Sequence, residues 1–303
     1  MNFLWTRQSA RFLPALALIA VTAVWGSTFF MIKDLVKVVP SLDFLGTRFL
    51  FAAVLIVLFQ FSRLRSASAS LWFKGAVLGA LYACAQVLQT VGLESTHASI
   101  SGFITGMYVV FTPIIYGLLS KTRIDVRTLA SAALAFGGVA ILGLKGFAFG
   151  YGEFLTLLGA LVYALHIIVL GRYAQKSQVL TLALIQVLFV GIFLGCASLP
   201  DGVVLPSGLS MWLSLLYMAL IAGLLALLLQ TWAQSKLSPV VAAVIMTMEP
   251  LFAAFFAVLC GGETLSIRMV CGGFFVLISM VLIEGKSAPI QENNQRRLKN
   301  EEN

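Results

Sequence analysis

The chain has 303 residues, of which 60% are hydrophobic and only 11% are charged, and its formal net charge is +8. Water-soluble domains are about 45–50% apolar and about 25% charged, so this composition excludes a single water-soluble core. The apolar runs are continuous and about twenty residues long, which excludes a β-barrel of short alternating strands and predicts an all-α integral membrane protein.

Ten apolar runs follow one another with short connections. Because backbone groups find no water in hydrocarbon, each run is predicted to be a helix. The first run is too long for a cleaved signal sequence, so we expect it to be retained. The runs cover residues 12–32, 42–61, 71–93, 100–120, 128–144, 154–174, 179–199, 211–234, 239–261 and 267–283. We therefore expect a cytoplasmic N-terminus (1–11), two five-helix repeats (12–144 and 154–284) joined by a linker loop (145–153), and a disordered cytoplasmic tail (285–303).

The loop cations predict the orientation. Fifteen of the twenty Lys and Arg residues fall on the side of the N-terminus, Arg48 lies within a span, and Lys33, Lys37, Lys145 and Arg268 fall on the other side. Because basic loops stay in the cytoplasm, we expect both termini there, in a bacterial inner (plasma) membrane. The positive charge is interpreted as contact with anionic lipid, and no nucleic-acid partner is expected.

A shift of 138 to 141 residues superimposes the first five runs on the last five. Trp25 then falls on Tyr163, Arg48 on Gln186, and Gln89–Thr90 on Gln230–Thr231. Since five is odd, the second repeat is predicted to be inverted relative to the first. Inverted repeats are typical of secondary transporters, whose substrate site lies between the halves.

Two prolines fall inside predicted spans, Pro113 in the fourth and Pro250 in the ninth. Each removes one backbone hydrogen bond, so both are predicted helix kinks, which serve packing or gating. Small-residue motifs such as Gly75-xxx-Gly79 predict close helix packing.

Two charged residues lie within spans. Glu249, halfway along the ninth span, is expected to face a cavity or a partner because a charge in the bilayer is costly. It is interpreted either as a protonated acid bonded to carbonyls freed by Pro250 or as a substrate or proton site. Arg48 in the second span either extends towards the membrane surface or meets a substrate anion.

Neutral polar and aromatic residues line single faces of several predicted helices. Tyr82, Gln86 and Gln89, for example, are spaced by four and three residues. Such faces predict a shared aqueous cavity, although hydrogen bonds between helices would use the same residues. The candidate cavity residues are Trp25, Ser27, Thr28, Arg48, Tyr82, Gln86, Gln89, Thr105, Tyr108, Tyr163, His166, Gln186 and Glu249.

Several function classes lack their motifs in this chain. It has two histidines, no acidic cluster and no CxxC pair, so no metal site or other cofactor is predicted. It also has no GxxxxGK[ST] phosphate loop and no ion-channel filter motif. We expect no enzyme activity.

Four segments resemble the EamA-type family of the drug/metabolite transporter superfamily. They are WGSTF at 25–29 with Lys33, RF with AA at 48–53, the stretch 95–113, and the segment from Ser238–Pro239 through Glu249–Pro250 to Gly262–Glu263. The resemblance spans residues 12–284, with Met248 in place of the usual leucine before the Glu–Pro pair. It implies ten helices in two inverted halves, a central cavity, and movement of small organic solutes such as amino acids, other metabolites or drugs, often outward.

The leading hypothesis is a secondary carrier that alternates access around the cavity, driven by a proton or solute gradient. A membrane enzyme acting on lipid-linked substrates and a non-transporting sensor or scaffold are the alternatives. The expected partners are a small-molecule substrate and the lipid bilayer, and no oligomeric state is predicted.

Overall fold

The structure of the chain is a computed structural model that describes residues 2–121, 126–145, 148–174, 178–200 and 202–279, together with Leu282. In these ranges, eight helical segments are long and apolar enough to cross a membrane, and two shorter apolar helices cover Ala130–Leu142 and Ile267–Ser279. These segments match the ten predicted runs, and the predicted helical membrane fold is confirmed. The predicted tail, 285–303, lies outside the described residues.

The first half begins earlier than expected, because its first helix includes residues 2–11, which the sequence placed in a terminal segment. Ser68 caps the third helix by accepting a hydrogen bond from the Leu71 amide at 3.3 Å. The helices are α1 (Asn2–Leu35), α2 (Ser41–Arg65), α3 (Ala69–Ser95), α4 (Ala98–Thr105), α5 (Tyr108–Leu119) and α6 (Val126–Gly143).

A short hairpin joins the halves where the sequence predicted a linker loop. Strand β1 (Leu144–Lys145) pairs antiparallel with β2 (Ala148–Phe149), and the next helix already begins at Tyr151. Paired strands satisfy the backbone groups of a short connection. The second half then comprises α7 (Tyr151–Ala174), α8 (Val179–Ala197), α9 (Leu209–Tyr217), the π-helix η1 (Met218–Leu225), α10 (Ala226–Gln234), α11 (Pro239–Ile245), α12 (Met248–Leu259) and the helix Ile267–Ser279.

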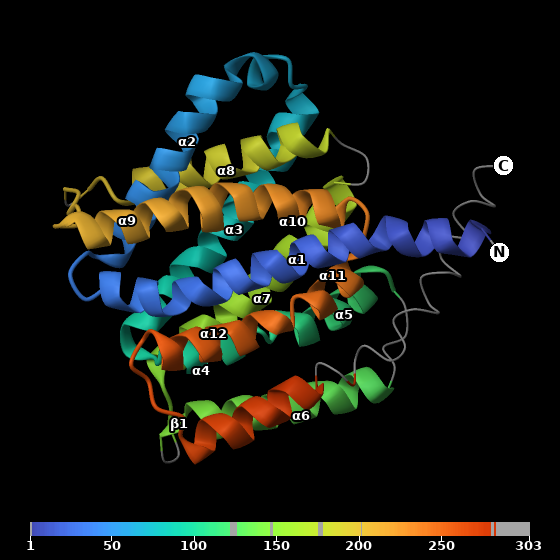
Figure 1. Ribbon diagram of the computed structural model, residues 1–303, viewed down its shortest axis with the longest axis vertical. Helices are drawn as coiled ribbons and strands as arrows, with labels where there is room; N and C mark the ends of the chain where they lie inside the picture. The colour runs from blue at the N-terminus through green and yellow to red at the C-terminus, as the bar shows by residue number, and fades with distance from the viewer. Residues whose placement is uncertain are drawn as a thin grey trace.

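The two halves pack in a two-fold pattern. Helix α1 lies between α10 and α12, and its counterpart α7 lies between α3 and α5. The equivalent helices α2 and α8 pair at one end of the molecule, and α6 pairs with Ile267–Ser279 at the other (Figure 1). The first helix of each half also starts at opposite edges in this view, α1 at the right and α7 beside β1 at the left (Figure 1). The halves are therefore inverted relative to each other.

The fourth and ninth spans are each broken into two helices. The fourth is interrupted at Gly106–Met107, between α4 and α5, and the ninth at Met246–Thr247, between α11 and α12. Pro250 explains the second break, because its nitrogen carries no hydrogen and cannot donate to the carbonyl of Met246, four residues earlier. Pro113 does not mark the first break, because α5 is continuous around it. Of the two predicted kinks, the one at Pro250 therefore goes with an observed break and the one at Pro113 does not, and the two breaks occupy equivalent places in the two halves.

Large apolar side chains cover the outside of the bundle. Phe59, Phe73 and Ile267 are 75%, 66% and 82% exposed. A protein in water would bury such groups, whereas lipid tails solvate them. The chain is an integral membrane protein.

Candidate functional site

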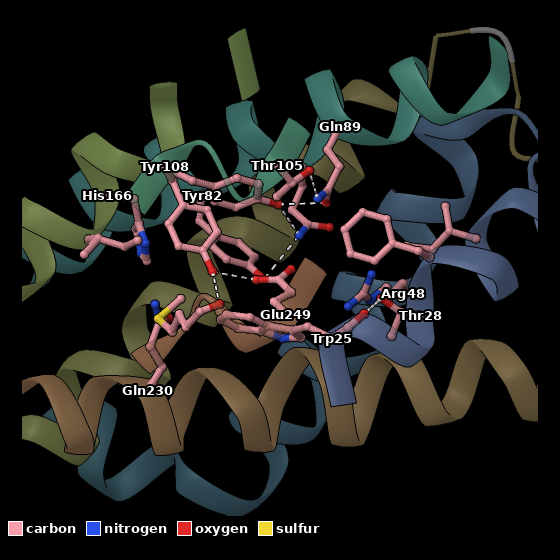
Figure 2. A pocket seen from close by; sticks show the side chains of 16 residues that line it. Trp25, Thr28, Arg48, Tyr82, Gln89, Thr105, Tyr108, His166, Gln230 and Glu249 are labelled. Atoms are coloured by element: carbon pink, nitrogen blue, oxygen red, sulfur yellow. Dashed lines mark hydrogen bonds between the residues drawn. The ribbon is translucent and has the colours of Figure 1, made fainter. Parts of the chain in front are cut away.

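A cavity lies at the seam between the two halves, enclosed by side chains from both (Figure 2). The space that water-sized molecules can occupy is about 30 Å³, enough for two or three waters at roughly 10–15 Å³ each. The lining residues are Trp25, Thr28, Phe29, Ile32, Arg48, Tyr82, Gln86, Gln89, Thr105, Tyr108, Tyr163, His166, Ile167, Gln230, Met246 and Glu249.

Glu249, at the start of α12, is held by a tyrosine of the other half. The Tyr108 hydroxyl lies 2.9 Å from Glu249 Oε2 and 2.8 Å from the Met246 carbonyl oxygen (Figure 2). That carbonyl also accepts from the Glu249 amide at 3.0 Å, and Pro250, four residues on, has no amide hydrogen to compete for it. The break in the ninth span thus places a carboxylate and a backbone acceptor at the same hydroxyl.

A chain of hydrogen bonds crosses the cavity wall from α3 to α4 and α7. Gln86 Nε2 donates to the Tyr163 hydroxyl at 2.6 Å, and that hydroxyl donates to Gln89 Oε1 at 3.0 Å. Gln89 Nε2 in turn donates to Thr105 Oγ1 at 3.0 Å. The polar face predicted on α3 therefore forms both a cavity wall and contacts between helices, the two uses that the sequence left open.

Arg48 and Trp25 both hold the π-helix η1. Arg48 Nε donates to the Met218 carbonyl at 3.0 Å, and Trp25 Nε1 donates to the Ala222 carbonyl at 2.8 Å. The Arg48 side chain is 2% exposed, and its guanidinium lies 4.8 Å from the centre of the Phe49 ring. Arg48 therefore points into the protein and not towards the membrane surface, which removes one of its two predicted placements.

Most of the predicted site residues meet at this cavity. Eleven of the thirteen line it, and the exceptions are Ser27 and Gln186. The Ser27 hydroxyl instead bonds the Val24 carbonyl and lies 2.8 Å from the Tyr217 hydroxyl. Gln186 is fully buried behind His166.

Sequence reasoning missed Gln230, Phe29, Ile32, Ile167 and Met246. Gln230 could have been predicted as a cavity residue, because the repeat aligns it with Gln89, which is a predicted cavity residue. Phe29 and Ile32 follow Trp25 by four and seven residues and so share its helix face. Met246 lies at the break in the ninth span, four residues before Pro250, where a kink was predicted but not its effect on the cavity wall.

A helical membrane protein of two inverted repeats, with a polar cavity enclosed at their seam, has the architecture of a membrane transporter. The model of the EamA-like transporter family matches residues 12–144 and again residues 150–285, once for each half. The chain belongs to this family.

Relatives with similar sequences have matching names. An uncharacterized transporter of Archaeoglobus fulgidus is 31% identical over 88% of this chain and 84% of its own length. The uncharacterized inner membrane transporter YedA of Escherichia coli K12 is 29% identical over 89% of this chain and 90% of its own. A crystal structure with 15% identity superimposes with a TM-score of 0.66 over 91% of this chain and 96% of its own, which supports the fold.

Proposed function

We propose that this membrane transporter is a secondary carrier that exports small organic solutes, such as amino acids, other metabolites or drugs, by alternating access around the central cavity. The observation that carries the proposal is the polar cavity at the seam, where Glu249 of one half bonds Tyr108 of the other. A movement that separates the halves on one side must change this contact. Solute binding and the relative position of the halves are thereby linked.

The cavity is too small for an organic solute while the halves are packed as in this structure. Opening towards one side at a time would widen it and would expose the lining residues to one solution only. A carboxyl group there can also take up a proton from one side and release it to the other, so Glu249 is suited to proton coupling. The chain has no phosphate loop for ATP, and a gradient is the remaining energy source.

Flux in proteoliposomes tests the proposal. We expect saturable transport of at least one solute from a panel of labelled amino acids and metabolites, stimulated by a proton gradient. Glu249→Gln keeps the size and hydrogen-bonding capacity of the side chain but cannot exchange a proton. It is expected to reduce transport at least about tenfold and to abolish its dependence on the gradient.

A matched control is Glu94→Gln, which changes a carboxylate that lies outside the cavity and accepts a bond from Ser41 at 2.5 Å. This variant should transport as the unmodified protein does. If no solute of the panel shows saturable flux, the carrier function is wrong. If Glu249→Gln transports with an unchanged gradient dependence, only the coupling role is wrong.

A further inference from the structure

We propose that the end of the cavity formed by His166 and Gln230 is a recognition subsite for a neutral hydrogen-bonding group of the solute, a carboxamide or a hydroxyl. The inference rests on the proposed transport function and adds to it the chemical class of the solute. In Figure 2, His166 and Gln230 lie at one end of the cavity, Arg48 lies at the other, and Glu249 lies between them.

The first evidence is that several buried polar atoms of residues lining the cavity make no regular hydrogen bond. Among the described residues, Oε1 of Gln230 and Oε1 of Gln86 have no hydrogen-bond partner, and the ring nitrogens of His166 make no hydrogen bond of normal geometry, although the Gln186 amide interacts with this ring. His166 and Gln230 are each 1% exposed. More than about 90% of buried polar groups in proteins are hydrogen-bonded, so several unpaired groups on residues of one cavity point to a molecule that completes their hydrogen bonds.

These atoms face the cavity and not a packed core. His166, Gln230 and Gln86 all line it. The His166 ring is held in place by the Tyr82 ring, 5.3 Å away between centres, and by Gln186 behind it. The Gln186 amide interacts with this ring, and by rotating it can support either tautomer of the imidazole.

The donors and acceptors at this end suit a group that can both give and take hydrogen bonds. A neutral imidazole has one donor and one acceptor nitrogen, and a glutamine amide can present either its oxygen or its nitrogen by rotating. A carboxamide or a hydroxyl can donate a hydrogen bond to one of these atoms and accept one from another at the same time. An apolar group would cover them and leave each one without a partner or water.

A charged group is disfavoured at the same place. Of the residues that line the cavity, only Arg48 and Glu249 carry a formal charge. An ion beside His166 and Gln230 would have no opposite charge next to it in a buried site. The ionic groups of the solute are therefore assigned to the region of Arg48 and Glu249, and its neutral polar group to this subsite.

Binding of two matched probes to the purified full-length protein tests the subsite. L-Glutamine and L-methionine have similar lengths and the same zwitterionic groups, but one ends in a carboxamide and the other in a thioether. Titration calorimetry or ligand-induced thermal stabilisation should show tighter binding of glutamine by about 10- to 100-fold, the range expected when buried polar groups are left unpaired.

The variant Gln230→Met replaces the amide by an apolar chain of similar size. We expect it to reduce the preference for glutamine about tenfold or more. The control Gln234→Met is one turn further along α10 and equally buried, but its amide donates to the Ile167 carbonyl at 3.0 Å and it does not line the cavity. It should keep the preference. His166→Phe provides a second variant if Gln230→Met does not fold.

The outcomes separate this inference from the transport function. Equal binding of both probes, binding of neither, or a preference that survives in folded Gln230→Met and His166→Phe overturns the subsite. Flux of solutes without a carboxamide or hydroxyl preference leaves the carrier standing and removes the subsite. Selective glutamine binding without any flux in proteoliposomes supports the subsite and removes the carrier function.

Discussion

Tyr108 and Glu249 occupy equivalent positions in the two repeats and contact each other. They are 141 residues apart, the same offset that aligns Gln89 with Gln230. Equivalent residues in a two-fold arrangement meet only near its axis, so this hydrogen bond marks the centre of the molecule. At this point one repeat carries a neutral donor and the other carries an acidic acceptor. The centre of the two-fold arrangement is therefore chemically asymmetric.

Removing the Tyr108 hydroxyl should impair transport without unfolding the protein. Tyr108→Phe keeps the buried ring but leaves Glu249 Oε2 without this donor, while the Met246 carbonyl keeps its hydrogen bond from the Glu249 amide. A lost hydrogen bond to a charged group corresponds to roughly 10- to 100-fold in transport efficiency. Initial rates of flux against solute concentration check this.

Tyr116→Phe, two turns further along α5 and half-buried, is the control and should leave the rates unchanged. Wild-type rates in Tyr108→Phe would show that the contact with Glu249 has no part in transport.

At the scale of single residues, sequence reasoning found the cavity but not all of its wall. Spacing on a helix identifies a shared face, which is why Tyr82, Gln86 and Gln89 were predicted together. It does not identify the neighbouring helix that this face meets. Ser27 lies two residues from Trp25 and turns towards Tyr217 instead. The sequence spacing alone shows which side chains share a face of one helix. Which other helix packs against that face depends on the whole fold.

At the scale of elements, close packing depends on glycines at helix crossings. A Cβ atom at Gly26 would lie 2.8 Å from the Ala253 amide nitrogen and 2.9 Å from the Phe252 carbonyl carbon, both backbone atoms that cannot move aside. Helix α1 can thus approach α12 only without a side chain at this position.

Gly26→Ala is therefore expected to destabilise the protein by about 1–3 kcal/mol through overpacking. Gly137→Ala is the matched control, because nothing lies within 4 Å of its added Cβ. Alanine favours a helix over glycine by about 1 kcal/mol, so the control should be neutral or slightly stabilising. Thermal unfolding of the purified variants measures both effects, and equal melting temperatures for the two would contradict the packing argument.

Of the interruptions of the helices, only the one before Pro250 has a signal in the sequence, and the other two could not be predicted. Hydropathy over residues 100–120 and 239–261 is continuous, so each read as one span. The break at Gly106–Met107 has no proline nearby, and the π-helical winding of Met218–Leu225 lies within an unbroken apolar run. Both are features of packing between helices. The number and order of the spans, by contrast, follow from apolar length alone and were predictable.

At the scale of the whole molecule, two interactions stabilise the turn between α3 and α4, which lies at the edge opposite the N-terminus (Figure 1). Lys33 donates to the Leu93 carbonyl at 2.9 Å and to the Thr96 carbonyl at the end of α3. Glu263 accepts a hydrogen bond from the Ala98 amide at 2.6 Å at the start of α4. A cation at a helix C-terminus and an anion at an N-terminus are both favourable. The turn between α3 and α4 is thus stabilised by a side chain of α1 and by a side chain of the loop before the last helix.

The predicted orientation places the edge with the α3–α4 turn outside the cell and both termini inside. In a variant without the four native cysteines, Val38→Cys should react with a membrane-impermeant maleimide in intact cells, because Val38 is 53% exposed at that edge. Ser66→Cys, exposed at the opposite edge, should react only after the cells are opened. The reverse labelling pattern would invert the topology.

The π-helix η1 has no counterpart in the first half, where the equivalent span α3 is a regular helix. If the two halves exchanged conformations during transport, the resulting structure would differ from the starting one. The reason is that Arg48 and Trp25 bond a π-helix that only the second half has. In the proposed carrier, the inward-open and outward-open forms without solute would therefore differ in free energy. A difference of about 1.4 kcal/mol already keeps ten molecules waiting on one side of the membrane for each one on the other.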